Sequence, residues 1–547
     1  MKGKRFLFAL LALALVFFSS LFLKPMDETR LKLLPRVEAH EALPPELAIT
    51  TAMLGGFRGI VIDALWLRAI TLKQQGQFFE MVQLYDWIGK LEPRFDAVWA
   101  FGGWDMAYNV SVELPPGEER WRWVQNGISF LRNQGLQYNP RSEALCKELS
   151  WIFLHKIGMD QDVSHLLYKR RLFLQMGKVV GDSSRKNIEA LSEAPLRKEE
   201  ALKDPDVRRV VEGLETFGLN TLSLDLLVGG AQTLPEEAKN FLRRLGQEDD
   251  PGLGKLIVFL MADRLRQTYR MDPQRMLDLM EKYGPLDWRT PYALAIYWGS
   301  LSQEYGTRHE TDFTMNFDRV VYQSLQELVR RGQFGLSERG QLIMSPDYSY
   351  AHKMDEVFVE LIEKYQNDET EIGIDSAHEN FLEGMVFDMF LMGRIEESQR
   401  WLQRLRSLYP RPKRDSLDEY VKIRLVPWLM ESIDSRRATS ALAAIVHRHY
   451  WLKATGDEPN AALMVDLAGQ VYQAYKERYE TNDQPFVVPS IEEIERRVLT
   501  DVFAGRFGWP DFTIERLRKI LGDKAKEYEK APDEDEKNLA GSKPSYQ

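Results

Sequence analysis

The sequence predicts an all-α protein: an α-solenoid of degenerate helical hairpins behind a single N-terminal transmembrane helix. Apolar residues recur at steps of three and four in segments 63–76, 78–91, 142–158 and 317–332, which is the pattern of amphipathic helices. Short connections containing Gly, Pro or Asn separate the segments, and such connections join antiparallel neighbours. The remaining observation is an unbroken apolar run near the N-terminus.

This apolar run covers Phe6–Leu23 and follows a basic segment, residues 1–5. As a helix its 18 residues reach roughly 27 Å, just enough for a hydrocarbon core of about 30 Å. The excess of basic residues before the run favours a cytoplasmic N-terminus and an extracytoplasmic location for the rest of the chain, periplasmic if the source is a Gram-negative-type bacterium. A cleaved signal peptide is the alternative, but it fits less well because the run is long and no small-x-small site follows. A lipoprotein is excluded because no cysteine comes directly after the run.

Composition describes the exported part. The 547 residues include 44% hydrophobic and 28% charged residues, enough to build several cores rather than a disordered tether. The net charge of −10 argues against nucleic acid as the main partner, since binding to its phosphates needs a concentrated basic face. Cys146 is the only cysteine, so no intrachain disulfide forms, and its amphipathic context predicts a buried thiol.

Two segments share a glycine-to-proline spacing. Gly76 and Pro93 are 17 residues apart, as are Gly393 and Pro410, and an amphipathic helix lies between the members of each pair. Glycine permits a tight turn, and proline can begin the next helix because its missing N–H is harmless there. This arrangement resembles the tetratricopeptide repeat (TPR), a 34-residue helix-turn-helix unit.

In the TPR register Ala69 is the small residue where the helices cross, and Tyr85 lies on the second helix. Pro140 and Gly158 extend the pattern beyond an inserted loop. In the Gly393 unit, Val386 takes the small-residue position, which departs from the family. The resemblance implies degenerate TPR-like hairpins with interruptions.

Further along the chain, segment 284–306 also fits this register. Thr290 is predicted to cap a helix that begins at Pro291.

Stretches of low periodicity divide the chain at 24–46, 180–207, 231–254 and 365–377. The predicted organisation is a basic segment (1–5), a transmembrane anchor (6–23), a Pro-rich linker (24–46), a TPR-like helical array (47–176), a degenerate helical-repeat block (208–365), a C-terminal TPR-like block (378–530) and a disordered polar tail (531–547).

Catalytic and metal-binding spacings give a negative result. His447 and His449 point about 200° apart on a helix and cannot chelate together, and no His-Glu-x-x-His pattern occurs. The glycines of segment 55–59 lack the Lys-Ser/Thr of a phosphate-binding loop. The sequence therefore predicts no catalytic residue, no metal and no cofactor, although a metal site assembled from distant segments stays open.

Aromatic residues carry the more useful signal, because seven of the thirteen tryptophans fall within the first array. Most are expected in hairpin cores, Trp66 and Trp87 among them. At least one of Trp121 and Trp123 is expected to face outward, since they lie on opposite sides of one helix. Exposed aromatic and charged side chains commonly anchor a bound peptide. The predicted partner-binding residues are Trp99, Trp104, Tyr108, Trp121 and Trp123, with Arg58, Asp63 and Arg68 as a polar rim that structural salt bridges would explain equally well.

These features predict a membrane-anchored scaffold that binds a protein or peptide partner on the extracytoplasmic side, as part of an envelope, secretion or surface-appendage assembly. An enzyme is the alternative, a hydrolase or polysaccharide-modifying protein with its site in 284–330 or 378–450. Partly buried carboxylates in a deep cleft would favour the enzyme, and a shallow aromatic groove would favour the scaffold. A third option places segment 46–66 against the lipid bilayer, although Arg58 and Asp63 favour a buried helix there.

Overall fold

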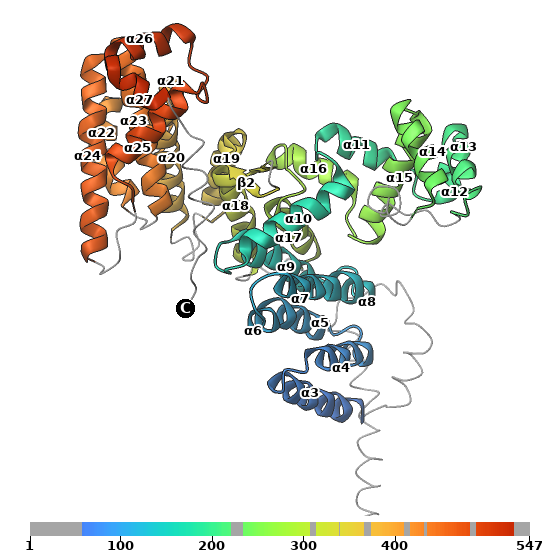
Figure 1. Ribbon diagram of the computed structural model, residues 1–547. Helices are drawn as coiled ribbons and strands as arrows, with labels where there is room; N and C mark the ends of the chain where they lie inside the picture. The colour runs from blue at the N-terminus through green and yellow to red at the C-terminus, as the bar shows by residue number, and fades with distance from the viewer. Residues whose placement is uncertain are drawn as a thin grey trace, which may run out of the picture. The chain divides into compact units, whose positions relative to one another are not determined.

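The computed structural model describes residues 57–219, 234–306, 313–337, 340–365, 373–409, 416–430, 435–481 and 488–529. Helices form nearly all of the regular structure in these ranges, with one two-stranded hairpin (Figure 1). The all-α prediction is confirmed, and the successive helices form a repeat-like array compatible with a solenoid. None of the described helices combines the length and apolar character needed to span a bilayer. The predicted anchor, the Pro-rich linker and the polar tail lie outside the described residues.

The chain divides into two compact units, residues 1–346 and 347–547. Each unit contains one of the helical hairpins that the glycine spacing predicts. In the first unit, α3 (Arg58–Gln74) and α4 (Phe78–Leu91) pack together on either side of Gly76. In the second, α20 (Ile374–Leu391) and α21 (Ile395–Leu408) do so around Gly393.

The two hairpins turn in the same way. Gly76 and Gly393 have φ values of 71° and 76°, a region that glycine enters without steric cost. The residue after each glycine donates its N–H to a carbonyl five residues earlier, Gln77 to Leu72 and Arg394 to Met389, both at 2.9 Å. This is the bond that closes a helix in a Schellman motif. The equal spacing in the sequence thus reflects equal backbone geometry.

Packing inside the first hairpin follows the expected register. Ala69 and Tyr85 are both buried, at 1% and 3% exposure. Val386, the departure in the second hairpin, is fully buried, and its carbonyl accepts a hydrogen bond from Ser398 Oγ at 2.7 Å. Ser398 of α21 therefore provides the close contact between the two helices at Val386. Pro410 lies outside the described residues.

Three helical rods follow the first hairpin, and each contains a π-helical segment. These segments are η2 (Asp105–Val110), η3 (Phe130–Gly135) and η4 (Ile152–Gly158). Such segments are rare and frequently occur at functional sites. The first rod consists of α5 (Asp96–Trp104), η2 and α6 (Ser111–Glu113). The second consists of α7 (Glu118–Ser129), η3 and α8 (Leu136–Tyr138), and the third of α9 (Glu143–Trp151) and η4.

Helix α17 (Pro291–Tyr305) forms the core of the first unit, because most of its residues are buried on all sides. It packs against α9, η4 and α18 (Phe313–Arg331). The predicted cap is confirmed: Thr290 Oγ1 accepts the N–H of Ala293 at 3.3 Å, and Pro291 is the first helical residue. Tyr292 donates to the carbonyl of Gly158 at 3.0 Å, which ties α17 to the end of η4.

Three other helices of this unit begin at an Asp-Pro pair, in which the aspartate accepts backbone N–H groups and proline takes the first helical position. Segment 180–207, predicted as a boundary, contains short helices, which are too brief to show a repeating apolar pattern. The remaining elements of the unit are α10 (His165–Val180), α11 (Arg185–Glu193), α12 (Lys198–Ala201), α13 (Pro205–Glu215), α14 (Glu236–Gln247), α15 (Pro251–Gln267), α16 (Pro273–Tyr283), β1 (Gln333–Leu336) and β2 (Leu342–Ser345).

The second unit holds buried polar groups between its helices. His378 bonds Asp355 at 2.8 Å and the Tyr409 hydroxyl at 3.0 Å, and Arg404 reaches the same aspartate at 2.9 Å. These contacts join α19 (Ala351–Tyr365), α20 and the end of α21. Besides α20 and α21, the unit comprises η6 (Tyr348–Tyr350), α19 (Ala351–Tyr365), α22 (Leu417–Leu429), α23 (Ser435–Thr455), α24 (Glu458–Thr481), α25 (Ile491–Phe503), α26 (Asp511–Leu521), η8 (Gly522–Lys524) and α27 (Ala525–Glu529).

Candidate functional site

Three of the predicted partner-binding tryptophans are core residues. Trp99 is fully buried, and Trp121 and Trp123 are only 9% and 2% exposed. The expectation that one of Trp121 and Trp123 faces outward is therefore wrong. The reason is that α7 has neighbours on both sides: Trp121 stacks on Tyr168 of α10, and Trp123 packs against Phe79 of α4.

Trp99 shows how tightly this core is built. Its indole N–H donates to the carbonyl of Pro93 at 3.2 Å, and its ring stacks on Tyr138 at 5.6 Å. A Cβ at Gly89 would lie 2.5 Å from the same ring, so only glycine fits there. Trp99 thus fixes the junction of α4, α5 and α8. Trp87 shows the opposite error: it was expected in a core and is 53% exposed.

The polar rim predicted for α3 consists of separate residues. Arg58 forms an ion pair with Glu92 at 2.8 Å, which is the structural role considered as the alternative. Asp63 and Arg68 are exposed. None of the three lines the cleft described below.

The other two predicted residues, Trp104 and Tyr108, lie on the first rod, together with two residues from the third rod. Trp104 stacks on Tyr108 with ring centroids 6.2 Å apart, Tyr108 lies 5.8 Å from His155, and His155 stacks on Trp151 at 4.8 Å. We call this series of four rings the aromatic ladder. Its two ends are accessible, because Trp104 is 36% and Trp151 39% exposed.

The π-helical segments contribute to the ladder. Trp104 and Trp151 are the last α-helical residues before η2 and η4, while Tyr108 and His155 lie inside these segments. A π-helix adds a residue to one turn and so changes where side chains four positions apart project. Both ladder pairs are four residues apart, and each pair crosses such a junction.

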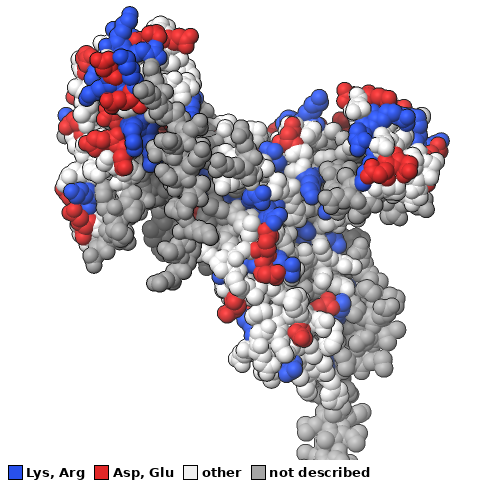
Figure 2. Space-filling model, viewed as in Figure 1, with Lys and Arg blue, Asp and Glu red and all other residues white. Residues whose placement is uncertain are grey.

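A cleft of about 420 Å³ lies beside the ladder. Trp104 and Trp151 line it, together with side chains from α9 and α18 and the backbone of α17. The surface around α3, α4 and α5 is largely white in Figure 2, which shows that few charged side chains lie on that face of these helices. The other lining residues are Lys147, Glu148, Ser150, Gly299, Arg319, Val320 and Gln323.

Glu148 is the unusual group in the cleft. Burial raises the pKa of its carboxyl to about 7, and the charge of Lys147 lowers it only in part. Glu148 Oε1 is buried without a hydrogen-bond partner among the described residues. Buried acceptors are nearly always satisfied, so an exception in a cleft marks a site that can receive a hydrogen-bond donor.

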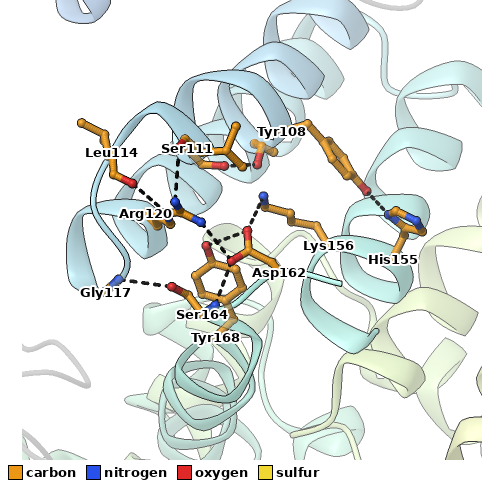
Figure 3. Close-up of polar contacts among 12 residues, drawn as sticks. Tyr108, Ser111, Leu114, Gly117, Arg120, His155, Lys156, Asp162, Ser164 and Tyr168 are labelled. Atoms are coloured by element: carbon orange, nitrogen blue, oxygen red, sulfur yellow. Dashed lines mark hydrogen bonds and ion pairs between the residues drawn. The ribbon is translucent and has the colours of Figure 1, made fainter. Parts of the chain in front are cut away.

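A buried ionic cluster centred on Asp162 lies next to the aromatic ladder. Asp162, in the loop between η4 and α10, accepts hydrogen bonds from Lys156 at 2.7 Å, from the N–H of Ser164 at 2.8 Å and from the Tyr168 hydroxyl at 3.3 Å (Figure 3). Arg120 of α7 reaches it at 3.4 Å. The cluster thereby joins α7, η4 and α10 at the point where η4 ends.

This cluster contacts the ladder directly. The Lys156 ammonium lies 5.5 Å from the centre of the Tyr108 ring, and the Tyr108 hydroxyl is 3.4 Å from His155 Nδ1 (Figure 3). Burial, and then the charge of Lys156, lower the pKa of His155. The lowered pKa favours the neutral imidazole of His155, and its ring stacks on Trp151.

Sequence reasoning missed Glu148, Trp151 and His155 as members of the site. Trp151 is one of the seven tryptophans of the first array, and His155 follows it by four residues. The signal that could have found the ladder is the same aromatic spacing in two neighbouring helices, Trp104 to Tyr108 and Trp151 to His155. The burial of Glu148 has no signature in the sequence.

Among the described residues, no group of three or more His, Cys, Asp or Glu side chains is arranged to hold a metal ion. Comparison with models of known protein families found no match, and a search of curated proteins found none.

Proposed function

We propose that this chain is a membrane-anchored, TPR-like scaffold that binds an extended segment of a partner protein in the cleft beside the aromatic ladder, on the extracytoplasmic side of the membrane. The observation that carries the proposal is the ladder itself. It presents two half-exposed indole rings from neighbouring rods, with their inner faces already packed. Large, preorganised aromatic rings supply most of the binding energy at many peptide sites, because little conformational entropy is lost when they are covered.

The shape and chemistry of the cleft favour binding over catalysis. Among the described residues that line it, Glu148 is the only acid. Glycoside hydrolysis generally uses two carboxyl groups, one on each side of the scissile bond. An aromatic groove with one carboxyl is the arrangement expected of a scaffold. The matched Gly76 and Gly393 turns support the TPR-like assignment, and the Phe6–Leu23 run supports the anchor.

Site-specific photo-crosslinking tests the binding function. A benzoylphenylalanine at Gln323, which lines the cleft, is introduced into the full chain and irradiated in intact cells. We expect a discrete crosslinked partner that disappears when Trp104→Ala is combined with Trp151→Ala. The matched control is Trp87→Ala, which removes a more exposed indole outside the cleft. Equal crosslinking with and without the two ladder tryptophans would refute the proposal.

Cysteine labelling tests the topology. Lys526→Cys places a thiol at a side chain that is 74% exposed, while native Cys146 is buried and does not compete. A membrane-impermeant maleimide should label this cysteine without lysis of the inner membrane. Labelling only after lysis would show that the helical units are cytoplasmic.

A further inference from the structure

Glu148 indicates what the bound segment carries. Its carboxyl lines the cleft, yet Oε1 has no hydrogen-bond partner among the described residues. The neighbouring Ser150 does not supply a donor, because its hydroxyl donates to the carbonyl of Ala295 at 2.8 Å. A buried carboxylate without a donor is costly, and a ligand that brings a donor removes that cost.

The charged and titratable groups around Glu148 come from each neighbouring element. Lys147 precedes it on α9, Tyr108 lies on η2, and His155 and Lys156 lie on η4. Burial raises the pKa of Tyr108, and the charge of Glu148 raises it further, so this phenol stays neutral. Lys156 is committed to Asp162. None of these groups donates a hydrogen bond to Glu148 Oε1.

Arg319 of α18 also lines the cleft, and both it and Lys147 would repel an incoming cation. Arg319 is exposed and Lys147 half-buried, so solvent screens their repulsion. The attraction of Glu148 acts through a less polar surrounding and is screened less. The indole faces of Trp104 and Trp151 add to it, because aromatic rings attract a cation placed over them.

We propose that the cleft recognises a lysine or arginine side chain of the partner segment, paired with Glu148 and in contact with the indoles that line the cleft, Trp104 and Trp151. The inference rests on the proposed binding function and specifies the chemistry of its ligand. A basic side chain satisfies the carboxylate, and its apolar stem covers the rings. A neutral apolar segment would cover the rings but leave Glu148 unpaired.

This recognition has a defined pH dependence. The free carboxyl titrates near pH 7, and pairing with a cation favours its ionised form, so binding releases a proton. Affinity should therefore rise about tenfold between about pH 6 and pH 8, as the ionised fraction of the free site rises from roughly a tenth to nine tenths. Burial and the charge of Lys156 lower the pKa of His155, which moves its titration toward more acidic pH and away from that of Glu148.

The test begins with selection of a random peptide library on the full chain in detergent, at about pH 8, where the Glu148 carboxyl is ionised. Parallel selections use the double variant Trp104→Ala/Trp151→Ala, the variant Glu148→Gln and the control Trp87→Ala. We expect peptides with a recurrent Lys or Arg to be enriched on the parent and the control but not on the double variant. On Glu148→Gln the preference for a basic residue should disappear.

One enriched peptide and its analogue with glutamine in place of the basic residue then give affinities by fluorescence anisotropy. We expect the peptide with the basic residue to bind the parent about tenfold or more tightly than its glutamine analogue. The two peptides should bind the Glu148→Gln variant with similar affinities that do not depend on pH. Enriched peptides without a basic residue, or affinity that falls as pH rises, would overturn this inference and leave the binding function standing. No enrichment over the double variant would overturn both.

Discussion

Removal of Asp162 should destabilise the first unit through Lys156. In the variant Asp162→Ala, the Lys156 ammonium loses its carboxylate partner while its side chain remains only 5% exposed. Arg120 is less affected, because it keeps the carbonyls of Leu114 and Val112 as acceptors at 2.7 and 3.2 Å. The Tyr168 hydroxyl and the Ser164 N–H each lose an acceptor. Breaking a buried ion pair in this way costs about 3–5 kcal/mol.

Scanning calorimetry of the full chain in detergent measures this cost, with hydrogen exchange used to assign each transition to a unit. At about 2–4 °C per kcal/mol, the transition of the first unit should move down by roughly 6–20 °C. That of the second unit should not move. The matched control is Glu119→Ala, which removes a carboxylate from an exposed pair with Arg122 and should cost no more than about 1 kcal/mol.

Two further results separate this mechanism from a general packing defect. Adding Lys156→Met to Asp162→Ala should recover most of the loss, because the unpaired charge is then absent. The loss should also shrink at high pH: burial lowers the pKa of Lys156 even in the parent, so the ammonium can release its proton once Asp162 is gone. A loss equal to that of Glu119→Ala, or one that Lys156→Met does not reduce, would refute the reasoning.

Three other predictions follow from the first unit. Gly127→Ala should lower its stability by about 1–3 kcal/mol in denaturant unfolding, since the new Cβ would lie 2.5 Å from the carbonyl oxygen of Gly103; Gly59→Ala, with open space around it, should not destabilise. Cys146 should resist N-ethylmaleimide at about pH 8 until the protein unfolds, as seen by mass spectrometry, because burial raises its pKa to about 12. Glu148→Gln should stabilise the unit by up to about 3 kcal/mol at about pH 8 and have little effect near pH 4. The reason is that the pKa of Glu148 is raised to about 7 in the folded protein, so the stability of the parent falls as pH rises from the pKa of the unfolded chain to about 7. A pH-independent effect of this last variant would contradict the assignment.

The sequence predicted those parts of the fold that depend on local rules. The Gly76 and Gly393 turns, the Thr290 cap and the burial of Ala69 follow from backbone freedom, capping and helical periodicity. Which face of a helix is covered depends on its neighbours, and this is where prediction failed. Trp121 and Trp123 project to opposite sides of α7 as expected, but α10 and α4 cover both.

The candidate site shows the same limit more clearly. Trp104 and Tyr108 could be selected from the sequence because one helix carries both, whereas their pairing with His155 and Trp151 depends on the packing of two rods. Glu148 is one of 82 acidic residues and becomes exceptional only through its surroundings. A helix-surface glutamate normally stays in water, whereas Glu148 is half-buried in the cleft beside two half-exposed indoles, and its Oε1 has no hydrogen-bond partner among the described residues. The binding proposal assigns the missing contact to another molecule, which would bring the hydrogen-bond donor that Glu148 Oε1 lacks among the described residues.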